Sequence, residues 1–276
     1  WVVFGNPTET SGRFAECWGR FRKRWTTLRV DARDAKKANK DMIREMIEDH
    51  GEDSDYVRVR VRGLPPIHGS VSFISPAAIL RAQLRAKAFD PTTIPLSIPK
   101  LMGIDVAREG DDESVMLFRQ GRWVSPEIFR YREPDLLNVA AIAAQHILRY
   151  RPDVVFVDET GLGAGVVDRL RQLGFAIIGV HAAAKPDSTP ANARRVGAVY
   201  KNKRAEMWGR MRDWVEQVGI LPDDPRLTID LEQPGYSHDG SDRLQIESKV
   251  LMKKRGASSP DSGDALALTF AVPVPT

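Results

Sequence analysis

The stretch Ile98–Phe118, IPKLMGIDVAREGDDESVMLF, predicts the hairpin around which the rest of the chain is organised. An apolar strand covers 101–106, a polar turn covers 108–113, and a second strand returns over 114–118. Asp105 lies inside the first apolar run, where burying an unpaired carboxylate is costly. This position indicates that Asp105 binds something, although a strand-end Asp that caps its own turn is the structural alternative.

A second acidic position, Asp158, lies in the segment Asp153–Glu159, DVVFVDE. Its continuous apolar run before Asp158 is typical of a parallel strand that is buried on both faces. A glycine-rich turn over 161–165, a helix over 166–173 and a buried strand over 175–180 should follow. The G-x-G-x-G spacing, with an acid at the strand tip, argues against a dinucleotide-binding loop.

A third acidic position opens the last helix of the chain, expected over Ala265–Val272. The sequence SSPDSGD places Asp261 and Asp264 in its first turn. Helix N-termini favour carboxylates, so capping alone would explain these two residues if the segment stood by itself.

The remaining elements of the second half predict a mixed α/β domain. A third strand should run from Gly121 to about Tyr131, followed by a helix over 134–150 and a long amphipathic helix over 202–218. The stripe of Met and Trp residues on that second helix, Trp208 among them, is interpreted as core. Short strands should follow over 227–231 and 244–247. A three-strand antiparallel meander followed by strand–helix alternation means a mixed sheet flanked by helices.

The first hundred residues have a different character. The proline-rich stretch Gly63–Pro99, with one helix over 76–87 that begins behind the cap Ser75, predicts a linker that joins two domains. Before it we expect strands at 1–4, 26–31 and 55–62 and helices at 13–21 and 40–50. The chain starts in mid-strand without Met, so we expect a fragment of a longer protein.

Composition narrows the class of protein. The single Cys17 excludes a disulfide framework and a multi-thiolate zinc site, and it favours a cytosolic protein. The apolar runs are shorter than a membrane span. The net charge is only +4, but the basic residues cluster at 20–24, 58–62, 194–204 and 249–255. Such clusters suggest a polyanionic partner, with a solvated charged surface as the alternative.

The three acidic positions together favour a metal site. Mg²⁺ and Mn²⁺ bind oxygen ligands, and two ions about 4 Å apart can clamp the attacking and leaving oxygens of a phosphodiester. That geometry needs carboxylates from different elements to converge at the carboxyl edge of a sheet. The ribonuclease-H-like arrangement supplies this convergence from a meander, a helix, a fourth strand and a terminal helix.

Three motifs carry a family resemblance. GIDVAREGDDES, VVFVDETGLGAGVVDRL and SPDSGDALALTF resemble those of the nuclease domain of phage and prophage large terminase subunits, which package DNA. WVVFGNPTETSGRF resembles the late strand and coupling segment of the terminase ATPase, and DSDYVRVRVRGLPP resembles the segment that joins ATPase to nuclease. The resemblance implies an ATPase remnant at 1–62, a linker region at 63–97, and a ribonuclease-H-like nuclease domain of the retroviral-integrase superfamily at 98–276.

By this resemblance Asp105, Asp158 and Asp264 are the catalytic metal ligands, and Asp261 is an auxiliary or second-metal ligand. Glu159 should not reach the site, because neighbouring strand residues face opposite ways, and we expect it to face the basic segment 185–204 instead. The implied activity is a DNA endonuclease that uses two Mg²⁺ or Mn²⁺ ions to cut concatemeric double-stranded DNA. No phosphate-binding loop is present, so we expect no ATPase activity from this fragment.

The resemblance also implies partners. We expect double-stranded DNA to contact the basic residues near the third motif, Lys249, Lys253, Lys254 and Arg255, and also Arg204. The full-length protein should bind ATP, the portal protein and the small terminase subunit in the cytoplasm of the bacterial host. The fragment should be monomeric and should not bind membranes. Two alternatives stay open: a junction resolvase or transposase catalytic domain on the same fold, and a non-catalytic portal or capsid docking module.

Overall fold

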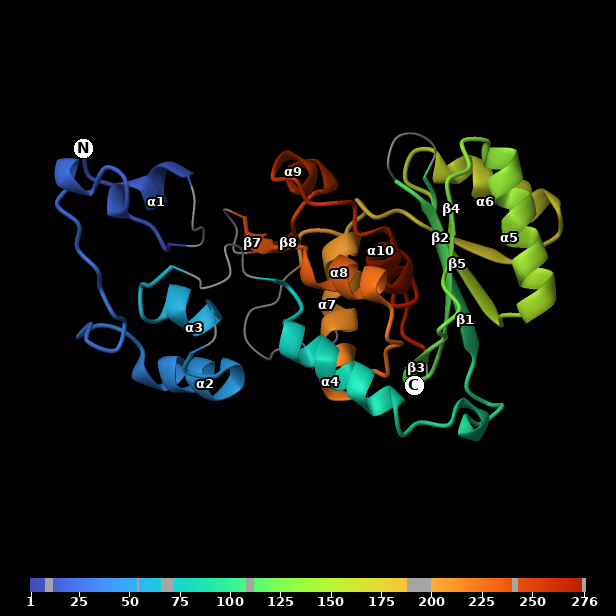
Figure 1. The fold of residues 1–276 in the computed structure, drawn as a ribbon, viewed down its shortest axis with the longest axis horizontal. Helices are drawn as coiled ribbons and strands as arrows, with labels where there is room; N and C mark the ends of the chain where they lie inside the picture. Colours follow the sequence, from blue (N-terminus) through green and yellow to red (C-terminus); the bar gives the residue numbers. More distant parts are fainter. Residues whose placement is uncertain are drawn as a thin grey trace. The chain divides into compact units, whose positions relative to one another are not determined.

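The computed structural model describes residues 1–7, 12–53, 55–65, 72–107, 112–187, 200–239 and 243–274. The chain forms two compact units, Trp1–Ser72 and Phe73–Thr276 (Figure 1). The basic cluster at 194–204 suggested a polyanionic partner, and its part before residue 200 lies outside the described residues. Among the described helices, none is long and apolar enough to cross a membrane.

The regular secondary structure described in the smaller unit is helical. Its elements are α1 (Gly12–Trp18), the 3₁₀ helix η1 (Arg22–Arg24), α2 (Lys40–His50) and α3 (Asp55–Arg60). The helices expected near 13–21 and at 40–50 are confirmed, whereas the strands expected at 1–4, 26–31 and 55–62 are wrong. Val57 of α3 and Val61, directly after the helix, lie one helical turn apart and pack against Ile43 of α2, so the alternation of valine and arginine fits a helix as well as a strand.

The larger unit contains the sheet and most of the helices. Its elements in chain order are α4 (Pro76–Ala86), η2 (Pro91–Thr93), β1 (Lys100–Asp105), β2 (Ser114–Gln120), β3 (Trp123–Val124), β4 (Phe129–Tyr131), α5 (Leu136–Tyr150), β5 (Val154–Asp158), α6 (Gly163–Gln172), β6 (Ile177–Val180), α7 (Lys203–Gln217), α8 (Pro225–Glu232), β7 (Tyr236–His238), β8 (Leu244–Ile246), α9 (Lys249–Lys254) and α10 (Asp261–Leu268).

The main sheet has the mixed topology that the sequence predicted. Its order is β3-β2-β1-β5-β6, and β4 also pairs with β2. β1 and β2 are antiparallel, whereas β1–β5 and β5–β6 are parallel. The expected third strand is divided into β3 and β4, which pair with opposite ends of β2. The carboxyl ends of β1 and β5 therefore lie at the same edge of the sheet.

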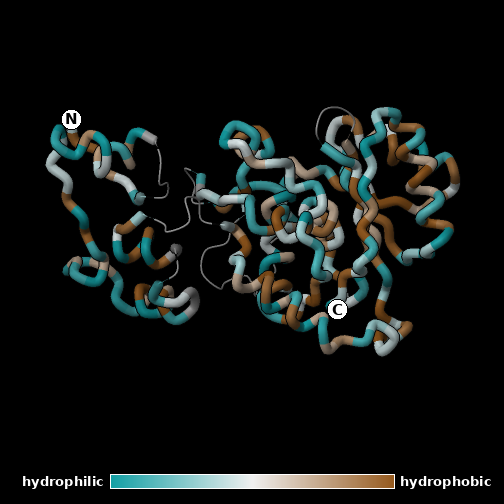
Figure 2. The backbone as a smooth tube through the Cα atoms, in the orientation of Figure 1, coloured by the Kyte–Doolittle hydropathy of each residue, from teal (hydrophilic) through white to brown (hydrophobic). Residues whose placement is uncertain are grey.

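Helices cover both faces of this sheet (Figure 1). Met102 and Ile104 of β1 pack with α5 and α6 on one face, and Leu101 of the same strand packs with α4, α7, α8 and α10 on the other. Hydrophobic segments accordingly run through the sheet (Figure 2). Side chains alternate along a strand, so Asp105 lies on the face that α10 covers.

Glycine at position 103 allows α10 to lie directly on β1. A Cβ atom on Gly103 would overlap the carbonyl oxygen of Ala265 in α10. Any larger residue at this position would force the helix away from the strand. The close approach brings the first turn of α10 to the end of β1.

Two elements of the larger unit differ from the sequence prediction. The stretch 227–231 is helix α8 and not a strand, because Leu227 and Leu231 lie one turn apart and are both buried. Asp224 caps this helix through a hydrogen bond from the Leu227 N–H, 2.7 Å long. Helix α9 lies in a stretch for which we had predicted only a basic cluster.

The predicted linker also differs from the observed unit boundary. Helix α4 begins behind its predicted cap Ser75, and its residues Ala78, Ile79 and Ala82 are buried in the core of the larger unit. Residues from Phe73 onward thus belong to the compact unit that contains the sheet. The assignment of the first 62 residues as an ATPase remnant stays a prediction.

We predict that Arg119→Met lowers the free energy of unfolding by roughly 2–4 kcal/mol, because it leaves buried carbonyl groups unpaired. Arg119 is buried, donates to the Thr269 and Gly121 carbonyl oxygens at 2.8 and 2.9 Å, and lies 4.2 Å from the Phe270 ring centre. Burial lowers its pKa to about 10. Urea unfolding measures the effect, and the exposed Arg122→Met is the matched control. A loss no larger than that of Arg122→Met would contradict the prediction.

Candidate active site

The end of β1 and the end of β5 each place one aspartate at the same sheet edge. The parallel register pairs Ile104 with Val157, so the next residues along, Asp105 and Asp158, are neighbours. Both side chains lie on the face that α10 covers. Asp105 is buried, whereas Asp158 is half-buried. The structure thus brings these two predicted site residues together.

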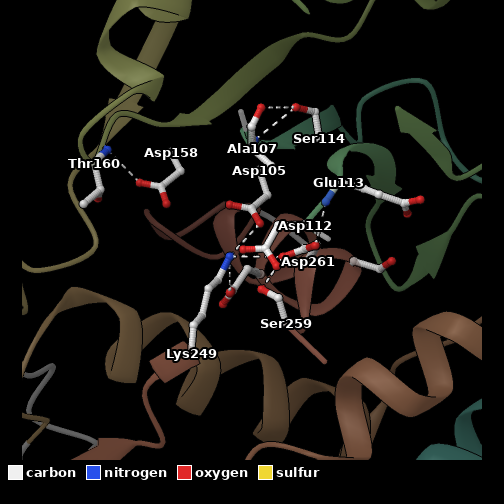
Figure 3. A network of polar contacts seen from close by, with 12 residues as sticks. Asp105, Ala107, Asp112, Glu113, Ser114, Asp158, Thr160, Lys249, Ser259 and Asp261 are labelled. Carbon is white, nitrogen blue, oxygen red and sulfur yellow. Dashed lines mark hydrogen bonds and ion pairs between the residues drawn. The ribbon is translucent and has the colours of Figure 1, made fainter. Parts of the chain in front are cut away.

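The first turn of α10 adds Asp261 and Asp264. The ammonium group of Lys249 lies between Asp105 and Asp261 (Figure 3). Its Nζ atom is 3.1 Å from Asp105 Oδ2, 3.2 Å from Asp261 Oδ1 and 3.3 Å from Asp264 Oδ2. Asp105, Asp158, Asp261 and Asp264, together with Lys249, are called the acidic cluster below.

Asp264 is held in place from α7. Arg204 donates to both of its carboxylate oxygens at 3.0 and 3.3 Å, and the indole N–H of Trp208 donates to Oδ1 at 2.8 Å. Arg204 also donates to the Glu247 carbonyl at 2.8 Å. We had expected Arg204 to contact DNA, but its guanidinium is mostly buried and orients a cluster carboxylate.

Asp261 is held by different donors. The hydroxyl of Ser259 donates to Oδ1, and the backbone N–H of Glu113 donates to Oδ2 at 3.0 Å. The next residue, Ser262, donates its backbone N–H to Asp230 of α8 at 2.7 Å. The α10 N-terminus is therefore fixed from two sides.

Asp158 stands at the rim of the cluster. Its Oδ1 accepts the backbone N–H of Thr160 at 2.9 Å, a hydrogen bond that is visible in Figure 3. Gly163 allows the following helix to pack closely here, because a Cβ at that position would overlap the Asp158 carbonyl. The neighbouring Glu159 lies over Gly179 of β6. We had expected Glu159 to face the segment 185–204, much of which lies outside the described residues.

Burial and neighbouring charges shift the pKa values of Asp105, Asp264 and Lys249. Burial raises the pKa of Asp105 well above its ordinary value; Lys249 opposes this rise, and the nearby Asp264, Asp261 and Asp158 add to it. Burial acts in the same direction on Asp264, but Arg204, Lys249 and Trp208 outweigh it and lower the pKa. Burial disfavours the charged form of Lys249, yet the three carboxylates around it raise its pKa.

The donor set of the cluster fits a hard divalent cation. All of its ligand atoms are carboxylate oxygens, the type that Mg²⁺ and Mn²⁺ prefer, and a cationic group already lies between three of them. In the described part of the chain, however, no three acidic, imidazole or thiol groups stand close enough together to hold a metal ion as they are. The Lys249 ammonium lies 3.1–3.3 Å from three of the carboxylate oxygens, so a metal ion bound by these oxygens would have to take its place.

The other basic residues expected to bind DNA lie on or beside α9. Lys249 belongs to the acidic cluster and does not form part of an exposed basic surface. Lys253 pairs with Asp112 at 2.9 Å, and Arg255 pairs with Glu247 at 2.9 Å, while Lys254 is exposed. Lys253, Lys254 and Arg255 therefore remain proposed contacts.

Sequence reasoning missed the groups that support the cluster, Glu113, Trp208 and Asp230. We had interpreted Trp208 only as part of a core stripe, although an indole N–H usually finds a partner when it is buried. Asp230 lay in a segment predicted as a strand, so its position beside α10 was hidden. For Glu113, the available signal was its position directly after Asp112 at the end of the turn between β1 and β2.

We predict that Asp230→Asn stabilises the protein at pH 8 by about 3 kcal/mol and that this gain disappears towards pH 4. Burial raises the pKa of Asp230 from 3.8 to about 6. Between those values the folded protein binds the proton more tightly than the unfolded chain, so rising pH lowers stability. The amide oxygen of asparagine still accepts the Ser262 N–H. Urea unfolding at several pH values tests this, with the exposed Asp168→Asn as the control; a gain that does not vary with pH would contradict it.

Comparison with solved structures confirms the fold. The chain is similar to the nuclease domain of the large terminase subunit gp2 of bacterial virus Sf6, with a TM-score of 0.62 and 20% identity over 73% of this chain and 99% of that one. A variant of the Sf6 domain solved with manganese has a TM-score of 0.61 and 20% identity, and the match covers 72% of this chain and 99% of that one. No family model and no curated protein matches the sequence. The chain thus has the ribonuclease-H-like fold of terminase nuclease domains, as the sequence predicted.

Proposed function

We propose that this chain is the nuclease part of a phage DNA-packaging terminase and cuts double-stranded DNA with the help of two divalent metal ions. The observation that carries the proposal is the convergence of carboxylates from β1, β5 and α10 at one sheet edge, around a point that already holds a cation. The likeness of fold to the Sf6 nuclease domain supports the choice of reaction.

In this proposal Asp105, Asp158 and Asp264 hold the metal ions, and Asp261 is an auxiliary ligand. Bound Mg²⁺ or Mn²⁺ would supply an activated water and would stabilise the charge that develops on the phosphodiester. The sheet edge fixes the first two carboxylates, and Arg204 with Trp208 fixes the third. Because their supports come from different elements, the carboxylates stay in place when the substrate binds.

Lys249 has two roles in this proposal. Without a divalent ion, its ammonium neutralises carboxylates that would otherwise repel one another across a buried space. Its side chain is about one-third exposed, at 35%, so the ammonium has a path out of the cluster when metal enters. The displaced ammonium then stays close enough to interact with the phosphate of a bound strand.

The substrate follows from phosphate chemistry. Carboxylates that act through metal ions recognise the geometry of a phosphodiester and not the identity of a base. We therefore propose endonucleolytic cutting with little sequence preference. Binding should weaken steeply with salt, because cationic side chains release counterions from DNA.

The experiment that tests the function is the conversion of supercoiled plasmid to nicked and linear forms. We expect conversion with MgCl₂ or MnCl₂ and none with EDTA. Manganese is a reasonable first choice, because the Sf6 domain has been solved with it. A protein that is folded by circular dichroism and leaves the plasmid intact at millimolar Mn²⁺ would overturn the proposal and favour a non-catalytic docking module.

A further inference from the structure

A carboxylate beside the acidic cluster anchors two arginines that the proposed catalytic groups do not include. Glu113 directly precedes β2, and its side chain is only 11% exposed. Its carboxylate accepts hydrogen bonds from Arg132, which follows β4, and from Arg226 in the first turn of α8. The bond from Arg132 Nε to Glu113 Oε1 measures 3.0 Å.

Both guanidinium groups reach solvent. The side chain of Arg132 is 71% exposed and that of Arg226 is 57% exposed. A guanidinium has five N–H donors, and each of these arginines uses only a small part of that set on Glu113. The remaining donors are available to a ligand that approaches from outside.

The pair carries net positive charge. The single carboxylate of Glu113 pairs with both guanidinium groups and neutralises only one of the two cations. A surface with two exposed guanidiniums and one surplus positive charge suits an anion such as a phosphate, which arginine can bind through two donors at once.

The position of the pair relative to the acidic cluster is fixed. The backbone N–H of Glu113 donates to Asp261 Oδ2 at 3.0 Å, so a single glutamate joins the arginines to a proposed metal ligand. The neighbouring Arg130 donates to both oxygens of Asp224 at 2.9 and 3.1 Å and to the Ser262 hydroxyl at 3.1 Å. These contacts tie β4, α8 and α10 together around the pair.

We propose that Arg132 and Arg226 form a phosphate clamp that holds the DNA backbone next to the phosphodiester being cut. This inference rests on the proposed function and adds the residues that place the strand. Phosphate contacts of this kind set the register of DNA without reading its sequence. Glu113 aligns both guanidiniums in advance, which reduces the side-chain freedom that is lost on binding.

The test is binding of a short fluorescent DNA duplex in EDTA, followed by anisotropy at several salt concentrations. Two lost phosphate contacts should reduce the salt slope, log K against log [salt], by about 1.8 in magnitude. We therefore expect Arg132→Ala/Arg226→Ala to bind more weakly with that shallower slope. Each single variant leaves one arginine on Glu113 and should lose about half as much of the slope.

The matched control is Arg149→Ala/Arg169→Ala, which removes the same charge from α5 and α6 on the other face of the sheet. Thermal unfolding shows that each variant is folded. If Arg132→Ala/Arg226→Ala has the same salt slope as the control, the clamp is overturned. The same holds if both single variants are folded and both show the slope of the control. Plasmid cutting is measured in parallel: a wild-type protein that binds through the arginines but does not cut would overturn only the proposed function.

Discussion

Asp105→Asn is expected to lower the rate of metal-dependent plasmid cleavage by roughly a thousandfold or more. Losing a metal ligand removes several kcal/mol of the stabilisation that the metal ion gives to the transition state. Asparagine has nearly the same shape and keeps an oxygen that can accept from Lys249 Nζ, now at 3.1 Å. The loss would therefore reflect the missing charge and not a misplaced side chain. Initial rates of nicking under saturating Mn²⁺ give the measurement.

The same substitution should raise the stability of the metal-free protein by on the order of 1 kcal/mol, because it removes a carboxylate whose charged form is disfavoured by burial. Lys249 does not become an uncompensated charge, since Asp261 and Asp264 remain 3.2 and 3.3 Å from it. Less activity together with more stability is the pattern expected of a site built for function.

Glu159→Gln is the matched control for this prediction. Glu159 is an acid at the same sheet edge, but its side chain lies over Gly179 and should not hold metal. We expect cleavage within a few-fold of wild type. If Glu159→Gln is inactive while Asp105→Asn or Asp158→Asn still cuts, the assignment of ligands to this edge is wrong.

The sheet could be predicted from the sequence because its signals are local and strong. The run DVVFVDE indicates a buried parallel strand, and β5 covers Val154–Asp158. The failures occurred where one pattern fits two structures. Valines at 57, 59 and 61 alternate like a strand, but Val57 and Val61 also lie one helical turn apart and pack together against α2. In α8 we overlooked a helix start signal, an Asp cap followed by Pro225.

The acidic part of the site could be predicted for a similar reason. Carboxylates at the ends of neighbouring parallel strands must meet at one edge, so the positions of Asp105 and Asp158 followed from topology. The role of Lys249 could not be foreseen. It lies in a helix of six residues, too short to show a period, and it stands in a basic cluster that resembles an exposed surface. Only the packing of α9 shows that this lysine faces the acids while Lys254 faces solvent.

Lys249→Met is expected to have the largest effect on stability. Methionine fills a similar volume without a charge, and the buried Asp105 and Asp264 would then face each other unneutralised. Breaking a buried ion pair by removing one partner costs about 3–5 kcal/mol, and protonation of Asp105 can return only part of that. We expect this loss in the free energy of unfolding in EDTA, measured with urea at pH 8.

Divalent metal should narrow the difference in unfolding free energy between the wild type and Lys249→Met. In the wild type a Mn²⁺ ion must displace the ammonium, whereas in Lys249→Met it enters a set of carboxylates that no cation neutralises. Since a ligand at 100 times its dissociation constant stabilises a folded protein by about 2.7 kcal/mol, the tighter Mn²⁺ binding of the variant should appear as a larger gain at the same concentration. The exposed Lys254→Met serves as the control. If Mn²⁺ stabilises the wild type and Lys249→Met equally, the ammonium does not occupy the position of a metal ion, and the proposed metal site must lie elsewhere along this sheet edge.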